Sequence, residues 1–198
     1  MYEWVKNITS TVEPIYDSIY GPRYRCSLTL KDGVFLPCAV IQSRRRLVDW
    51  VKRRIKEEMQ GQGRIGGEDP YGQIISAFVA SGNRINDYEV LSAAESRYAI
   101  PLPLLSVIEG ETAMAWTCWV FRMRDGRLFS YGSSFSMEFF QPPDGYEFSD
   151  VEEVINHSYI DPNGVLKSVE MGPCLPDDYN PGPILRERVF FTCAVDGI

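Results

Sequence analysis

Hydrophobic and polar residues alternate along this chain with two periods, and the shorter period predicts strands. Apolar runs flank Asp32-Gly33, and Asp-Gly between apolar runs is a strong hairpin signal because both central residues of the tight turn take a positive φ. We therefore predict a hairpin with strands at 24–30 and 35–42. Pro37 cannot donate to a sheet, so it predicts an edge or a bulge in the returning strand.

A second hairpin is predicted around Asp125-Gly126. In residues 112–124 both alternating sets of side chains are apolar, which is typical of a strand covered on both faces. A two-residue turn would place Val120 opposite Tyr131. Gly132 then predicts a bulge in the returning strand, because glycine inside a strand often marks one.

The longer period predicts a main amphipathic helix at about 43–59. Leu47, Val51 and Ile55 recur at helical spacing, and Ser43 can accept a hydrogen bond from a backbone N–H of the first turn. Weaker patterns predict further elements: helices within 2–20 with an interruption at Pro14, a strand at 74–80, a helix at 87–98, a helix at 150–156 capped by Ser149, and a last strand at 184–195.

Together these elements predict the fold class: α+β, a single domain over 1–198. We expect a mostly antiparallel twisted sheet built on the two Asp-Gly hairpins and packed by the main helix and shorter helices. The chain has 198 residues, of which 44% are hydrophobic, so it can bury a core without disulfides or metals.

Cysteine usage and hydropathy predict a cytoplasmic location. The five cysteines form no Cys-x-x-Cys pair and lie mostly in apolar runs, which is typical of reduced thiols in a core. No apolar run reaches the roughly 18 residues of a membrane span, and residues 1–6 do not read as a signal peptide. We therefore expect no membrane association.

Charge and motifs exclude several classes of function. The net charge of −7 argues against nucleic-acid binding, although residues 23–64 are locally basic. Gly61 to Gly66 match G-x-G-x-x-G, but they follow a helix instead of a strand, so a dinucleotide site is not expected. His157 is the single histidine, and we expect it to be a capping or surface residue. We expect no cofactor, no metal and no catalytic residue, and the sequence favours a non-enzymatic role.

Three arginines lie at a helix N-terminus, where negative side chains are usually favoured. Arg44, Arg45 and Arg46 begin the main helix, where the macrodipole already places positive charge. One interpretation is an anion site, with guanidinium groups and helix N–H groups holding phosphate or carboxylate. The other, which we favour, is that these arginines pair with acids of the same chain.

The leading hypothesis is a protein-binding module that acts by occlusion and meets a partner with a basic surface. In its small size, acidity and lack of catalytic motifs the chain resembles immunity proteins of bacterial toxin systems, and no residue is carried over from that resemblance. The candidate partner-binding residues are Asp144, Tyr146, Glu147, Asp150, Glu152, Glu153, Asp177, Asp178 and Tyr179. The alternative is a protein or enzyme that binds a small anionic ligand, with a pocket lined by the aromatic strands between 116 and 140 and by Arg44–Arg46.

Overall fold

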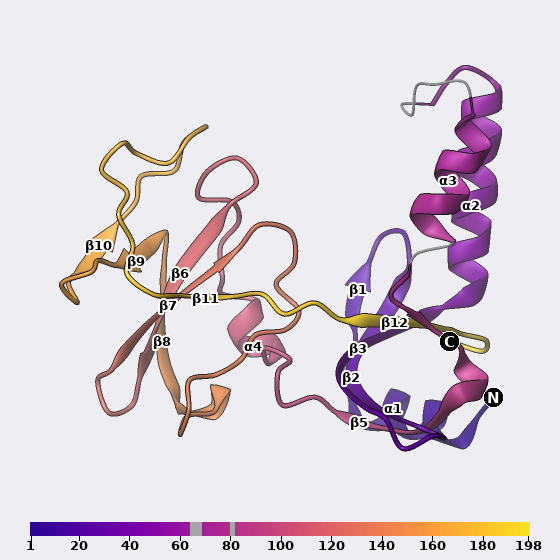
Figure 1. Ribbon diagram of the computed structural model, residues 1–198, viewed down its shortest axis with the longest axis horizontal. Helices are drawn as coiled ribbons and strands as arrows, with labels where there is room; N and C mark the ends of the chain where they lie inside the picture. Colours follow the sequence, from indigo (N-terminus) through magenta and orange to yellow (C-terminus); the bar gives the residue numbers. More distant parts are fainter. Residues whose placement is uncertain (64–68, 80–81) are drawn as a thin grey trace. The chain divides into compact units, whose positions relative to one another are not determined.

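The computed structural model describes residues 1–63, 69–79 and 82–198, and it has an α+β fold, as predicted (Figure 1). The chain forms two compact units. Unit 1 consists of residues 1–96 and 190–198, and unit 2 consists of residues 97–189. The sequence shows no linker at either boundary, and the prediction of one domain stays a prediction.

Unit 1 is built on a six-stranded sheet. Its main path runs β1 (Ile15–Asp17), β2 (Gly21–Leu30), β3 (Phe35–Ser43), β12 (Phe191–Val195) and β4 (Arg84–Ile85), and β5 (Val90–Glu95) pairs with β2. Pairs among β1, β2, β3 and β5 are antiparallel. Strand β12 is parallel to both β3 and β4. A strand from residues 191–195 therefore lies between strands from the first 96 residues of the chain.

The first hairpin forms as predicted, but with a longer loop. The N–H of Leu30 donates to the carbonyl of Val34 at 2.8 Å, which leaves three residues in the loop. Of these only Gly33 has a positive φ, at 89°. This is a type I turn closed by a glycine bulge, so the expected tight turn with two positive φ values is wrong. The register between β2 and β3 shifts at Pro37, and β12 pairs with β3 only from Ala39 onward, so the proline marks a bulge where β3 has a strand on one side alone.

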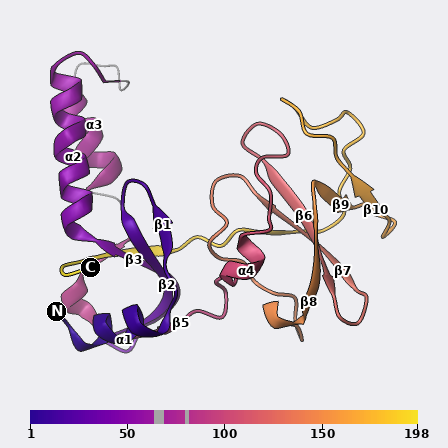
Figure 2. The ribbon, with the colours of Figure 1, turned by 180° about the vertical axis from the view of Figure 1, so that it is seen from behind.

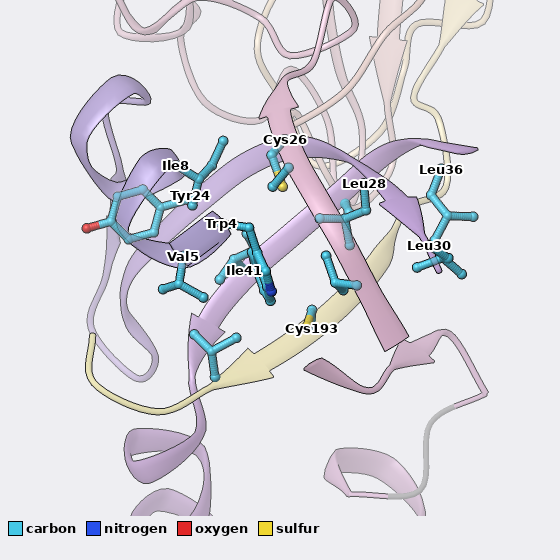
Figure 3. Close-up of a cluster of buried hydrophobic side chains, with 14 residues drawn as sticks. Trp4, Val5, Ile8, Tyr24, Cys26, Leu28, Leu30, Leu36, Ile41 and Cys193 are labelled. Atoms are coloured by element: carbon cyan, nitrogen blue, oxygen red, sulfur yellow. The ribbon is translucent and has the colours of Figure 1, made fainter. Parts of the chain in front are cut away.

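The two faces of this sheet are covered by different helices. Helix α1 (Glu3–Thr11) places Trp4, Val5 and Ile8 on a core of strand side chains (Figure 3). On the opposite face lie α2 (Arg44–Met59) and α3 (Pro70–Phe78), which run side by side, extend away from the sheet in both views and pack on it at Ala194 (Figure 2). Burying each large apolar side chain contributes on the order of 1.5–3 kcal/mol. The second half of β3, between β2 and β12, is buried throughout.

Three predicted elements of unit 1 are wrong. After Pro14 the chain forms β1 and not a second helix. The strand predicted at 74–80 is helix α3 as far as Phe78, and Ala80 lies outside the described residues. Asp69 caps this helix by accepting the N–H of Gly72, with Pro70 in its first turn. The helix predicted at 87–98 is a short 3-10 turn, η1 (Asp87–Glu89), followed by β5, because β2 offers that segment a pairing partner.

Unit 2 contains a four-stranded sheet in the order β11 (Ile184–Arg186), β7 (Leu128–Ser133), β6 (Thr117–Met123) and β8 (Val151–Asn156). A two-stranded ribbon, β9 (Ser158–Ile160) and β10 (Leu166–Ser168), and the short helices α4 (Leu102–Leu105) and η2 (Phe148–Asp150) complete it. Strand β6 is buried apart from Arg122, and the Trp119 ring stacks on Tyr131, so the prediction of a strand covered on both faces is confirmed.

Several details predicted for unit 2 are wrong. Tyr131 pairs with Trp119 and not with Val120, because the Asp125-Gly126 turn also has a three-residue loop. Gly132 pairs in regular register, and a Cβ there would lie 2.4 Å from the Trp116 ring, so the glycine permits close packing. Residues 151–156 form strand β8 and not a helix capped by Ser149, and the last predicted strand divides into β11 and β12.

The cysteines behave as predicted, since all five are free and four of them are buried, with Cys174 exposed. Over the described ranges, no helix is long and apolar enough to cross a membrane. Within the same residues, no group of three or more His, Cys, Asp or Glu side chains is arranged to hold a metal ion.

Candidate functional site

Helix α2 of unit 1 is flanked by two cavities. The first, of about 650 Å³, lies between α2, α3, β12 and β4, and we name it the Gln42 cavity. The second, of about 660 Å³, lies on another side of α2, beside Ser18 and Ile19, and we name it the Arg46 cavity. Both volumes lie in the range of roughly 300–1,000 Å³ that small-molecule sites occupy.

The wall of the Gln42 cavity is mainly apolar. Successive turns of α2 contribute Leu47, Val51 and Ile55, and α3 contributes Ile75 opposite them. Further apolar or aromatic side chains line it: Val48, Tyr71, Val79, Ile85, Tyr88 and Ala194. Several of these, including Tyr71 and Tyr88, are exposed large side chains, so the cavity continues an apolar surface.

Gln42 is the unusual group in this wall. It lies on β3 beside Ala194 of β12 and is only 5% exposed. Its side-chain amide forms no hydrogen bond with any residue that the structure describes. Its amide atoms are not sealed from solvent, so a molecule bound in the cavity would replace water at them. The remaining exposed part of Gln42 faces the cavity, where a bound molecule can satisfy the amide.

Arg44 lies at the same cavity and is held by partners within the chain. Its guanidinium lies 2.8 Å from the carboxylate of Asp87 and 3.1 Å from that of Asp196. It also donates to the carbonyl of Ala194 at 2.7 Å. These contacts offset its unfavourable position at the helix N-terminus.

Arg45 and Arg46 line the other cavity, together with Arg53. Arg45 makes only a loose ion pair with Asp49, at 3.9 Å. Arg46 forms no ion pair with any described residue, and its side chain lies against Gly21, where an added Cβ would come within 2.6 Å of it. The three consecutive arginines are therefore divided: Arg44 is paired at one cavity, and Arg45 and Arg46 face the other.

No protein-family model, no curated protein and no solved structure matches the chain. Its function must therefore be inferred from its own sites. The aromatic residues of 116–140, which the sequence offered as a pocket lining, lie in unit 2, where Trp119, Phe121, Tyr131 and Phe140 form a core. The Gln42 cavity takes its aromatic side chains from Tyr71 and Tyr88.

The predicted partner-binding residues all lie in unit 2, and they differ in their contacts. Exposed carboxylates belong to Asp144, Glu147, Glu152, Glu153, Asp177 and Asp178. Glu153 pairs with Arg122 at 2.6 Å, and Asp150 accepts the N–H of Glu147 at 2.8 Å. These residues lie on separate segments: the loop before η2, η2 itself, β8 and the loop after β10.

The two predicted aromatic anchors are already engaged. The hydroxyl of Tyr146 donates to Asp125 at 2.6 Å, and its ring packs on Phe129. Tyr179 packs on Tyr159, and burial raises the pKa of the Tyr179 hydroxyl to about 12. Neither ring is a free exposed anchor.

His157 occupies a hydrogen-bonded chain that the sequence analysis missed. It links β8 to β9 with φ at 47°, a conformation that is rare for residues other than glycine. Its Nδ1 lies 2.9 Å from the Thr112 hydroxyl, and its Nε2 lies 2.9 Å from the Glu109 carboxylate. The order hydroxyl, imidazole, carboxylate matches a catalytic triad, but Thr112 is fully buried, so no substrate reaches its hydroxyl. These two hydrogen bonds hold the segment 109–112 against the junction between β8 and β9.

Proposed function

We propose that unit 1 binds a small organic molecule in the Gln42 cavity. The observation that carries this proposal is an apolar cavity of about 650 Å³ into which the Gln42 side chain opens, with an amide that forms no hydrogen bond to a described residue. An apolar wall with a few polar groups directed into it is the usual composition of a ligand site. We therefore propose binding of a ligand at this cavity.

The test is the substitution Gln42→Leu, which keeps the approximate volume and removes the amide. Because the Gln42 amide forms no hydrogen bond with a described residue, its removal should leave the variant about as stable as the wild type. It should lose binding of hydrogen-bonding ligands found by a fragment screen with ligand-observed NMR. Gln60→Leu is the matched control, because it makes the same chemical change at the exposed end of α2.

Two results would contradict the proposal. One is a screen in which no fragment binds the wild type competitively at this cavity. The other is a Gln42→Leu variant that binds every fragment as the wild type does.

A second proposal retains a protein partner with a basic surface, bound by the acidic residues of unit 2. It is supported by Asp144, Glu152, Asp177 and Asp178, which are exposed and form no ion pair with a described residue. Association of such a partner should slow as salt rises, because exposed charges are screened beyond roughly 8 Å at physiological ionic strength. An association rate that is independent of salt would remove electrostatic steering from this proposal. The free cysteines support a reducing, cytoplasmic location.

A further inference from the structure

The buried charges around the Gln42 cavity already have partners within the chain. Four charged side chains line it: Arg44, Lys52, Arg84 and Asp87. Arg44 lies 2.8 Å from the Asp87 carboxylate, and Arg84 also has an interaction partner in the chain. Lys52 is exposed, so water solvates its ammonium group. A ligand charge brought to the interior of the cavity would therefore lose its water and find no buried counterion available among the described residues.

The polar groups that remain on the floor of the cavity are neutral. Gln42 of β3 and Thr192 of β12 line it from one face of the sheet, because Thr192 lies two residues before Ala194, the residue beside Gln42. Neither side chain forms a hydrogen bond with a residue that the structure describes. Gln42 is the more deeply placed of the two, at 5% exposure, whereas Thr192 is half-buried.

The Gln42 amide has a specific chemical complement. Its carbonyl oxygen accepts hydrogen bonds and its NH2 group donates them, and the two lie side by side in one plane. A carboxamide or a lactam presents the same two functions and can pair with it through two hydrogen bonds. An ester or a carboxylate offers acceptors only, and an ammonium group offers donors only. The floor therefore favours a neutral ligand group that both donates and accepts.

The shape of the cavity determines where the rest of the ligand lies. Gln42 lies at the foot of α2, just before the capping residue Ser43. From there α2 and α3 extend away from the sheet (Figure 1). The lining residues of α2 from Leu47 to Ile55 cover about 12 Å of helix at 1.5 Å per residue, and Ile75 of α3 lies opposite them. An elongated apolar body is thus accommodated between the helices when the polar end points to the sheet.

From these observations, and resting on the proposed function, we propose that the ligand is an elongated neutral molecule with an apolar body and a terminal carboxamide or lactam. The amide end pairs with Gln42 at the sheet. The body lies between α2 and α3, along Leu47, Val51 and Ile75. Carboxylates and amines with the same body are poor ligands.

Four compounds that share an eight-carbon chain test this proposal: octanamide, N,N-dimethyloctanamide, octanoate and octylamine. Titration calorimetry on the full chain at pH 7 should give octanamide about two- to tenfold tighter binding than its dimethyl derivative, which cannot donate; this is the fold-change expected of one neutral hydrogen bond. Octanoate and octylamine, both charged at this pH, should bind about tenfold more weakly than octanamide or worse.

Gln42→Met is the decisive variant, because it keeps the length of the side chain and removes the amide. The ratio of the affinities for octanamide and N,N-dimethyloctanamide should fall by about two- to tenfold in this variant. Two controls should keep the wild-type ratio. Thr192→Val removes the other neutral group of the floor, and Gln60→Met makes the same chemical change at the exposed end of α2. Urea titration of each variant checks that it folds as the wild type does.

The outcomes separate this proposal from the proposed function. If neither the fragment screen nor this series gives a ligand, the proposed function is wrong. If fragments bind in the cavity but octanamide does not, or if octanoate or octylamine binds as tightly as octanamide, the cavity binds ligands and the neutral amide is wrong. A ratio that survives Gln42→Met unchanged, or that is lost in Thr192→Val instead, would overturn the pairing with Gln42.

Discussion

At the scale of single residues, identical side chains in one helix turn have different roles. Arg44 is surrounded by Asp87, Asp196 and a backbone carbonyl, whereas Arg46 has no acid partner among the described residues. The sequence predicted internal pairing for all three arginines, and this holds firmly for Arg44 alone. The difference arises because the acids come from η1 and from the segment after β12, which reach only one side of α2.

We expect Arg44→Gln and Arg46→Gln to differ in stability. Arg44→Gln leaves Asp87 poorly paired and should lower the free energy of unfolding by about 1–2 kcal/mol. Arg46→Gln should change it by less than about 0.5 kcal/mol, because it removes a cation from the positive end of a helix dipole. Urea denaturation of both variants measures this, and equal losses would show that Arg46 has a partner of its own.

Glu187 in unit 2 should make stability depend on pH. Its side chain is 5% exposed and contacts the Arg186 guanidinium and both the N–H and the hydroxyl of Ser134. Burial raises its pKa, but the hydrogen bonds from Arg186 and Ser134 outweigh burial, so the net pKa is lowered from 4.5. A lowered pKa gives stability that is present above the unfolded-state value and is lost as pH falls through the folded-state value.

Glu187→Gln should therefore lower the free energy of unfolding by about 1–2 kcal/mol at pH 7. The difference from the wild type should shrink as pH falls below about 4.5, where the wild-type carboxylate also begins to lose its charge. Glu170→Gln, an exposed change in the same unit, is the control. Thermal unfolding at a series of pH values measures both, and a difference that stays constant down to pH 3 would contradict this role.

At the scale of elements, the sequence correctly predicted the helices and hairpins whose formation depends on a few neighbouring residues. The first hairpin and helix α2 follow from an Asp-Gly turn and a serine cap, and both signals act over a few residues. The segments at 87–98 and 150–156 were predicted as helices, but each forms a strand beside a distant partner, β2 or β6. A strand that forms because of a pairing partner far away in the sequence cannot be predicted from the local pattern of residues.

Two serine substitutions compare a predicted helix cap that forms with one that does not. Ser43 accepts the N–H of Arg46 at the start of α2, so Ser43→Ala should cost about 0.5–2 kcal/mol. Ser149 has the same sequence context but caps no helix, because Glu147 and Asp150 cap each other in η2. Ser149→Ala should therefore change stability by less than about 0.5 kcal/mol, and a loss equal to that of Ser43→Ala in urea denaturation would contradict the structure.

The Gln42 cavity could not be predicted for the same reason. Its lining comes from α2, α3, η1 and β12, which the sequence separates by up to about 150 residues. The sequence offered Arg44 as a ligand contact, and Arg44 does line the cavity. Gln42 gave no signal, because whether its amide has a partner depends on Ala194 and on the helices above it.

At the scale of the whole molecule, the chain leaves unit 1 after Ser96 and returns at Phe190. A single domain, as the sequence predicts, requires that both units unfold together. Ile8→Ala removes a fully buried side chain of unit 1 and should cost about 2–5 kcal/mol. If the prediction is right, native-state hydrogen exchange will show protection lost equally from β3 in unit 1 and from β6 in unit 2. Loss confined to unit 1 would show two independent domains.

The place of β12 between β3 and β4 has a consequence during synthesis on the ribosome. All of unit 2 emerges before the strand that completes the sheet of unit 1, and at 5–20 residues per second the interval lasts roughly ten seconds. Throughout that time the nascent β3 carries an edge that lacks its neighbour. An edge of this kind accepts a matching strand from another molecule. Nascent chains that lie close together on one messenger are therefore open to pairing with β12 of a completed copy, and a chaperone that shields β3 would protect the yield of correctly paired chains.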